Sequence, residues 1–94
     1  MFEIQQTEPG TFRLRGRFDA AQEKVAQGVF DRIEGDCTLD CAELAYISSS
    51  GLGLLVALEK RLNKRGARAR LLNLNPHIRE LLAMAGLDRV LQIE

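Results

Sequence analysis

The sequence predicts a single α/β domain with a mixed sheet of four to five strands, in which an N-terminal antiparallel edge strand precedes parallel β-α units. Short segments with the two-residue period of strands alternate with longer segments whose apolar residues recur every three to four positions, as in helices. Only a turn, Glu8-Pro9-Gly10, separates the first two strands, which favours their antiparallel pairing. No repeat or linker interrupts the 94 residues, so we expect one domain over residues 1–94.

The N-terminal third is expected to form a hairpin followed by a helix. Strands are predicted over residues 2–6 and 11–15, the second because apolar and charged residues alternate there. Asp19 is placed to cap a helix that runs to about residue 33, and Gly35 ends it. The predicted buried face of this helix holds Ala21, Val25, Val29 and Ile33, with Ala26 and Phe30 beside them.

The central part predicts a core strand and a second helix. The strand covers residues 37–41, and residues 42–47 form a connection to a run of three serines. Ser50 is the best candidate for the N-cap of the helix, which ends at Gly66 after several basic residues. Its predicted inner surface consists of Leu52, Leu55, Leu58 and Leu62.

The C-terminal part predicts one more strand and one more helix. Residues 67–74 are expected to form a third core strand, and Asn75 to cap the last helix, with Pro76 in its first turn. Gly86 ends this helix. Its predicted buried face holds Ile78, Leu81, Leu82 and Ala85, and the residues expected to fold back after it are Leu87 and Val90.

Charge argues against two classes of partner. The 13 basic and 13 acidic residues give a net charge of zero, so we expect neither nucleic acid nor a membrane surface as a partner. Residues 1–43 hold nine acidic and five basic residues (−4), and residues 44–94 hold four acidic and eight basic (+4). The N-terminus is polar and no long apolar run follows, so we expect a cytoplasmic protein. We also expect a monomer or a weak dimer.

The two cysteines and the one histidine do not suggest a catalytic or metal site. Cys37 and Cys41 lie four strand residues apart, about 13 Å, whereas a disulfide needs Cα atoms roughly 4.4 to 6.8 Å apart. We therefore expect both thiols to be reduced and buried. His77 is expected on the surface of a first helical turn. Without a nucleophile–base pair or a phosphate-binding glycine loop, we expect no enzymatic activity and no cofactor.

Three segments, in order and covering nearly the whole chain, resemble one known family. Residues 39–53 end in Ser48-Ser49-Ser50-Gly51-Leu52-Gly53, which is similar to the Asp-Ser-Ser-Gly-Leu-Gly signature of the STAS domain family. Residues 75–87 resemble the closing helix of that family, and Gly16-Arg17-Phe18-Asp19 resembles the Gly-x-x-Asp before its first helix. On these matches the chain is identified as a STAS-like domain, similar to the anti-sigma factor antagonists.

The resemblance implies a regulatory role. In those antagonists the serine before the glycine, here Ser50, is phosphorylated by a partner that is both anti-sigma factor and serine protein kinase, and this partner switching regulates transcription. Many members have Asp at the position of Ser48. ATP and Mg²⁺ would belong to the kinase. The partner-binding surface implied here consists of Asp19, Ser48, Ser49, Ser50, Gly51 and Leu52.

Three alternatives remain open. Ser50 can be merely a helix cap worth about 1 kcal/mol, with Gly51 and Gly53 allowing tight packing. A cluster of basic residues can bind nucleic acid, although no aromatic residues lie among them, so a solvated face is favoured. These residues are Lys60, Arg61, Lys64, Arg65, Arg68 and Arg70. Within the family, the alternative is a non-phosphorylated STAS binding subunit of a lipid transporter or other regulatory complex.

Overall fold

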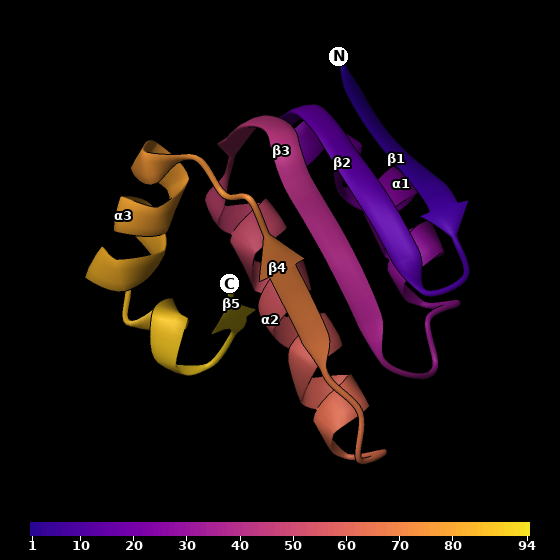
Figure 1. Cartoon of the computed structure of the whole chain (residues 1–94). Helices are drawn as coiled ribbons and strands as arrows, with labels where there is room; N and C mark the ends of the chain where they lie inside the picture. The colour runs from indigo at the N-terminus through magenta and orange to yellow at the C-terminus, as the bar shows by residue number, and fades with distance from the viewer.

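In the computed structural model, which describes residues 1–94, five strands form one mixed sheet in the order β1-β2-β3-β4-β5. β1 and β2 pair antiparallel, and every later pair of neighbours is parallel (Figure 1). The expected fold class and the antiparallel N-terminal edge strand are thereby confirmed. The elements are β1 (Phe2–Glu8), β2 (Thr11–Phe18), the 3₁₀ helix η1 (Ala20–Gln22), α1 (Glu23–Phe30), β3 (Cys37–Ile47), α2 (Ser49–Asn63), β4 (Ala69–Leu72), α3 (Pro76–Met84), the 3₁₀ helix η2 (Leu87–Arg89) and β5 (Gln92–Ile93).

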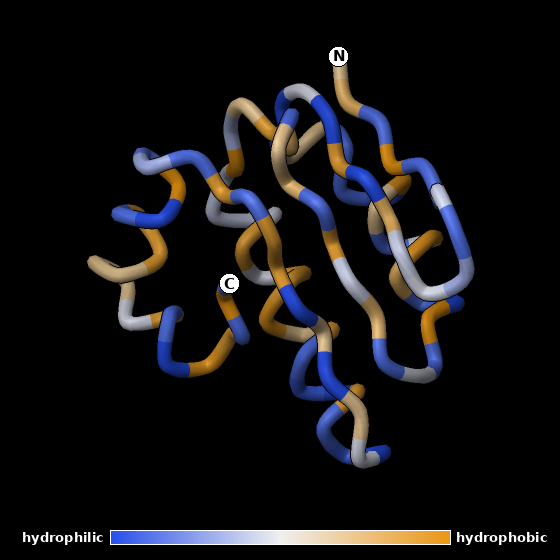
Figure 2. The backbone as a smooth tube through the Cα atoms, in the orientation of Figure 1, coloured by the Kyte–Doolittle hydropathy of each residue, from blue (hydrophilic) through white to orange (hydrophobic).

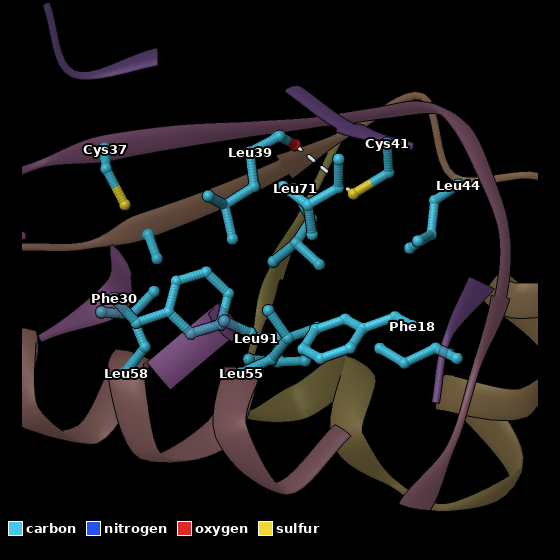
Figure 3. Close-up of a cluster of buried hydrophobic side chains, with 14 of the residues drawn as sticks. Phe18, Phe30, Cys37, Leu39, Cys41, Leu44, Leu55, Leu58, Leu71 and Leu91 are labelled. Carbon is cyan, nitrogen blue, oxygen red and sulfur yellow. Dashed lines mark hydrogen bonds between the residues drawn. The ribbon is translucent and has the colours of Figure 1, made fainter. Parts of the chain in front are cut away.

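One hydrophobic cluster of 21 buried residues fills the space between the sheet and its helices. Figure 1 shows α1 and α2 behind the sheet, and Figure 3 shows side chains of β3 opposite those of α2. Leu39 of β3 and Leu62 of α2 have no exposed surface. Each fully buried leucine contributes about 1.5–3 kcal/mol relative to an exposed one, so this cluster is the main source of stability.

The opposite face of the sheet is polar. Arg15 lies 3.5 Å from the Glu3 carboxylate and 3.3 Å from that of Glu43, and Arg70 lies 3.3 Å from Glu94. Hydrophilic and hydrophobic residues alternate along the strands in Figure 2, as expected of a sheet with one solvated face. Because these ion pairs are half exposed, each contributes at most about 1 kcal/mol.

β3 is longer than predicted and includes the segment interpreted as a connection. It continues to Ile47, but the buried positions after Cys41 are three residues apart, at Leu44 and Ile47. Two register shifts against β2 account for this spacing, because each inserts an extra residue into β3 as a β-bulge. The Asp40 carboxylate accepts a hydrogen bond from the Ala42 N–H (3.1 Å) at the first bulge. The strict two-residue period is lost there, and the prediction was wrong for that reason.

The first helix begins later than predicted and buries a narrower face. Asp19 caps the 3₁₀ turn η1, whose tighter winding shifts the phase of the following helix. Ala26 and Phe30 are the buried residues of α1, whereas Ala21 is exposed and Val25 is 56% exposed. The predicted face is therefore wrong at Ala21 and Val25, whereas Ile33 is buried as expected and Val29 is half-buried.

The last helix begins as predicted. Asn75 accepts a hydrogen bond from the Ile78 N–H (2.8 Å), and Gly86 follows the helix with φ 73°, a left-handed conformation that favours glycine. Ile78 and Leu82 are buried as expected, whereas Ala85 is exposed. The helix thus packs against the core mainly through Ile78 and Leu82, which form one side of the predicted buried face.

The segment after this helix differs from the prediction. Leu87 packs against the core, but Val90 is 38% exposed, and Leu91 is buried in its place. The 3₁₀ turn η2 rotates the chain so that Gln92 and Ile93 pair with β4, which itself covers only part of the predicted 67–74 segment. β5 is thus a two-residue strand that no periodicity could reveal.

A buried carboxylate, Glu59 of α2, was not anticipated. In the parallel pairing of β3 with β4, the Cys37 N–H donates to the Arg68 carbonyl, and the Ala69 N–H therefore points away from β3. On that other side of β4, the short strand β5 pairs only with Arg70 and Leu71 and does not reach Ala69. Glu59 is fully buried and accepts that N–H at 3.2 Å, while the Arg68 guanidinium lies 3.4 Å away. Glu59 therefore takes the place of a missing strand neighbour.

Both cysteines are free and buried, as predicted. Burial raises the pKa of the Cys37 thiol to about 11 and that of Cys41 to about 12. The Cys41 thiol also donates to the Leu39 carbonyl (3.6 Å), drawn as a dashed line in Figure 3. The thiols are held in their neutral form by the core.

Candidate functional site

The candidate residues lie at the edge of the sheet where β2 and β3 end. Phe18 and Ile47 are registered partners, and the Ser48 N–H donates to the Phe18 carbonyl at 2.8 Å. Asp19 and Ser48 therefore leave the sheet side by side. Because parallel strands end at the same edge, two segments about 30 residues apart in sequence form one surface.

Two helical segments begin at this edge, and each has its own cap. The Asp19 carboxylate accepts a hydrogen bond from the Ala21 N–H (3.1 Å) and so caps η1. The Ser48 hydroxyl accepts one from the Gly51 N–H (3.1 Å) and caps α2. Each cap satisfies one of the N–H groups that have no acceptor inside a helix, which typically contributes about 1 kcal/mol.

The N-cap of α2 is Ser48, so the prediction of Ser50 was wrong. Ser48 has the extended backbone of a cap (φ −86°, ψ 171°), and its hydroxyl lies three residues before the N–H that it accepts. Ser49 and Ser50 are the first and second residues of the helix, Ser49 exposed and Ser50 half-buried. Three consecutive serines look alike in sequence, and only the backbone conformation distinguishes them.

This assignment explains the departure from the STAS signature at Ser48. Asp and Ser are about equally good N-caps, because either side-chain oxygen can accept the N–H at the third helical position. Serine at position 48 therefore keeps the structural role that an Asp would have there. What it removes is one negative charge beside the helix N-terminus.

The two glycines after the serines differ in role. A Cβ on Gly51 would lie 2.8 Å from Ile47 Cγ1 and 3.2 Å from the Phe18 ring, so the start of α2 packs too closely for any side chain. A Cβ on Gly53 would meet nothing within 4 Å. The expected packing role is thus confirmed for Gly51 and wrong for Gly53. Gly51 is itself buried, so it shapes the surface rather than forming it.

Electrostatics at the start of α2 favour an anion. The backbone N–H groups of Ser49 and Ser50 have no acceptor within the helix, and no acidic side chain lies in its first turn. The helix dipole places about half a positive charge there. The half-buried Asp19 supplies a carboxylate on the neighbouring loop. The positive end of the helix and the Asp19 carboxylate therefore lie at the same edge of the sheet.

Five of the six candidate residues contribute to this surface directly. Ser48 and Ser50 are half-buried, Ser49 is exposed, and the half-buried Leu52 packs against the core. The sequence interpretation missed Arg17, whose guanidinium carbon lies 4.3 Å from the centre of the Tyr46 ring. These two residues are registered partners just before the strands end, but both lie beyond the strands predicted over residues 11–15 and 37–41, and two register shifts precede them, so no sequence signal located them.

No three His, Cys, Asp or Glu side chains are grouped so as to hold a metal ion, and none of the helices has the length and apolar character needed to span a membrane. His77 is exposed, as predicted. Four of the six clustered basic residues engage partners within the chain. These contacts are Arg61 with the Phe30 carbonyl, Arg65 with Glu34, Arg68 with Glu59 and Arg70 with Glu94.

Comparisons with known proteins point to one family. A family model described as "Mlab, STAS domain" matches residues 2–92. A STAS-domain containing protein of Pseudomonas aeruginosa (strain UCBPP-PA14) is 26% identical over 86 residues, which cover 88% of this chain and 85% of the relative. An anti-sigma F factor antagonist of Paenibacillus polymyxa is 33% identical over 55 residues, 58% of this chain and 47% of the relative.

Solved structures share the fold. The Bacillus cell fate determinant SpoIIAA in its phosphorylated form matches with a TM-score of 0.72 at 20% identity, over 100% of this chain and 91% of that one. The anti-sigma factor antagonist SpoIIAA in its unphosphorylated form matches with a TM-score of 0.75 at 21% identity, over 100% of this chain and 88% of that one. An anti-sigma factor antagonist from Mycobacterium paratuberculosis matches with a TM-score of 0.80 at 16% identity, over 99% of this chain and 83% of that one. Since the family model spans nearly the whole chain, this protein belongs to the STAS domain family.

Proposed function

We propose that this protein is an anti-sigma factor antagonist that binds an anti-sigma factor with serine kinase activity and is switched off by phosphorylation of Ser50. The observation that carries the proposal is the position of Ser50 in the first turn of α2, where its hydroxyl is not needed as the cap because Ser48 supplies it. The names of two relatives support it. One is an anti-sigma F factor antagonist, and SpoIIAA has been solved with and without phosphate.

Phosphorylation would act on binding rather than on folding. A phosphate adds about 1.5 to 2 negative charges at pH 7, and a helix N-terminus can accommodate them. A partner that had packed against a neutral hydroxyl would instead have to desolvate these charges, beside the carboxylate of Asp19. We expect partner affinity to fall about 100-fold or more, which corresponds to roughly 3 kcal/mol.

The proposed binding surface consists of the serines and the residues that border them. Ser49 and Leu52 present a small polar and an apolar contact, and Asp19 lies on the adjoining loop. In this proposal residues 1–94 act as one non-enzymatic cytoplasmic domain without a cofactor, and the kinase supplies ATP and Mg²⁺.

Phosphosite mapping and affinity measurements on three variants test the switch. Ser50→Ala should bind the purified anti-sigma factor of the same cell with wild-type affinity and should incorporate no phosphate. Ser50→Asp should bind more weakly, although less so than the phosphorylated protein, because a carboxylate carries less charge. Ser49→Ala, which changes the neighbouring exposed hydroxyl, is the matched control and should behave like wild type.

Ser48 requires a different control, because it caps the helix. Ser48→Asp retains the cap and restores the charge found in many family members, so any effect on kinase recognition can be read without loss of stability. Phosphate found only on Ser48 or Ser49, or wild-type affinity of Ser50→Asp, would contradict the proposed switch.

One observation favours a second candidate. The matching family model is described by the name Mlab and not as an anti-sigma factor antagonist. In this alternative the chain is a non-phosphorylated STAS binding subunit of a lipid transporter or other regulatory complex, and the same surface binds constitutively. The alternative predicts no phosphate on protein isolated from the native cell, which separates it from the switch, since both candidates predict unchanged complex formation by Ser50→Ala.

A further inference from the structure

The inner face of the β1–β2 hairpin is only partly covered by α1. That helix ends at Phe30, and beyond it lies a groove of about 490 Å³ next to β1. A second hollow of about 220 Å³ extends it toward the hairpin turn at Gly10 and shares Phe12, Arg32 and Ile33 with it. Figure 1 shows β1 at one edge of the sheet with α1 behind it. The groove is lined by Ile4, Gln6, Phe12, Val29, Arg32 and Ile33.

The strand beside this groove has unpaired backbone groups. The Met1 carbonyl accepts the Arg17 N–H at 2.9 Å, so Met1 and Arg17 form a hydrogen-bonded pair of the antiparallel ladder. Such pairs alternate along a ladder, and the backbone N–H and C=O groups of Ile4 and Gln6 therefore point away from β2. The residues whose side chains line the groove are thus the same ones that offer free hydrogen bonds at the sheet edge.

One charged side chain, Arg32, lines the groove; of the two carboxylates that line the adjoining hollow, Glu34 pairs with Arg65 and Asp36 accepts the Arg68 N–H. Arg32 is exposed at the groove and forms no ion pair. A second copy of β1 would present Phe2, Ile4 and Gln6 on its inner face, none of which is acidic. Pairing between two copies of this chain would therefore leave Arg32 without a counterion. A strand with a carboxylate on its inner face would supply one.

We propose that β1 and this groove form a second interaction site, which binds an extended acidic segment of another protein by strand addition. The added strand pairs with the free groups of Ile4 and Gln6, places alternate apolar side chains in the groove, and directs a Glu or Asp toward Arg32. The groove lies toward the amino end of β2, whereas the serines lie at its carboxyl end. The site therefore goes beyond the proposed switch and can be occupied together with it.

A synthetic peptide tests the proposal directly. The probe is fluorescein-labelled Thr-Val-Thr-Val-Thr-Glu-Thr, whose valines and glutamate share one face of a strand. Binding to the full chain is measured by fluorescence anisotropy. A scrambled peptide of the same composition, without the alternation, should bind at least about tenfold more weakly. No binding of the probe to the wild-type chain, or equal binding of the scrambled peptide, would overturn the proposal.

Two protein variants test the backbone and the charge separately. Gln6→Pro removes the outward N–H and should weaken probe binding about tenfold relative to Gln6→Ala, which removes the same groove-lining side chain but keeps the N–H. Arg32→Glu should weaken the Glu probe about threefold or more and favour a probe with Lys at that position. Arg79→Glu, an equal change of charge at an exposed site on α3, is the control.

The proposal can still be tested if the Gln6→Pro variant does not fold. Urea unfolding shows whether Gln6→Pro folds, and if it does not, the charge reversal at Arg32 alone decides, since that residue is exposed. Strand addition would be refuted if Gln6→Pro and Gln6→Ala changed probe binding equally. It would also be refuted if the Arg32→Glu variant still bound the Glu probe better than the Lys probe. Sedimentation of a wild-type dimer that Gln6→Pro dissociates would assign the groove to a second copy instead.

Discussion

The two ends of β2 and β3 are built differently, although the same strands form both. At the carboxyl end the strands lead directly into capped helical segments, and α2 packs so closely on Phe18 and Ile47 that Gly51 has no room for a Cβ. At the amino end, α1 stops short of the hairpin and leaves the groove beside Phe12. One end is closed by packing, and the other is open.

This difference separates two kinds of binding surface. At the closed end, the serine backbone is fixed by caps, so that adding a charge can change recognition while the fold stays the same. At the open end, unpaired strand groups and an apolar groove can be covered only by something added to them. The following predictions test whether the two ends differ in energy as well as in shape.

The largest expected difference is between two phenylalanines of β2. Phe18 is fully buried and stacks on Phe2, with ring centroids 4.6 Å apart, whereas Phe12 is only partly buried at the groove. Phe18→Ala should lower the free energy of unfolding by about 3–5 kcal/mol. Phe12→Ala should cost less than about 2 kcal/mol. Urea denaturation measures both, and equal costs would show that the amino end is as tightly packed as the carboxyl end.

The second comparison is between the glycines of the signature. Gly51→Ala should destabilise the protein by about 1–3 kcal/mol, because its Cβ would lie 2.8 Å from Ile47 Cγ1. Gly53→Ala meets no neighbour and should stabilise α2 by roughly 0.5–1 kcal/mol through helix propensity. In urea denaturation, the unfolding midpoints of the two variants should therefore move in opposite directions, while the m-value stays unchanged. Movement in the same direction would contradict the close packing at Gly51.

The third comparison concerns the serines at the closed end. Ser48→Ala removes the cap and should cost about 1 kcal/mol, whereas Ser50→Ala should change stability by less than roughly 0.5 kcal/mol. Ser48→Asp should match wild type. Thermal unfolding of the three variants provides the measurement. A larger loss for Ser50→Ala than for Ser48→Ala would reassign the cap to Ser50.

The smallest effect is expected at the thiols, which differ in distance from the open end. Cys37 lies at the start of β3 near the groove and is 4% exposed, whereas Cys41 is fully buried. In single-cysteine variants at pH 8 both should react slowly with a thiol reagent, Cys37 faster than Cys41. Reversal of that order would argue against opening at the amino end.

The same thiols predict a loss of stability in alkali. Burial raises the pKa of Cys37 from 9.0 to about 11, so the folded state disfavours its thiolate. The resulting stabilisation is complete below pH 9 and is lost as the pH rises from about 9 toward 11. Replacing Cys37 by Ala should reduce this alkaline slope, as measured by urea midpoints across that range.

Most elements of the fold could be predicted from the sequence because their signals are local. The cap at Asn75, the turn at Gly10 and the buried leucines of α2 each depend on a few neighbouring residues. Predictions failed where a distant contact shifted the local pattern. Bulges against β2 interrupted the period of β3, and the two-residue β5 exists only because β4 lies beside it.

The sequence by itself determined the order of strands and helices, and with it a mixed sheet with parallel β-α units, while the family resemblance grouped Asp19 with the three serines. Only the tertiary structure decided which serine caps α2, since that depends on the extended backbone that Ser48 adopts while pairing with Phe18. It also decided that Gly51 is packed and Gly53 is not, and that Glu59 is buried. These features depend on neighbours from other elements, which no local pattern of residues specifies.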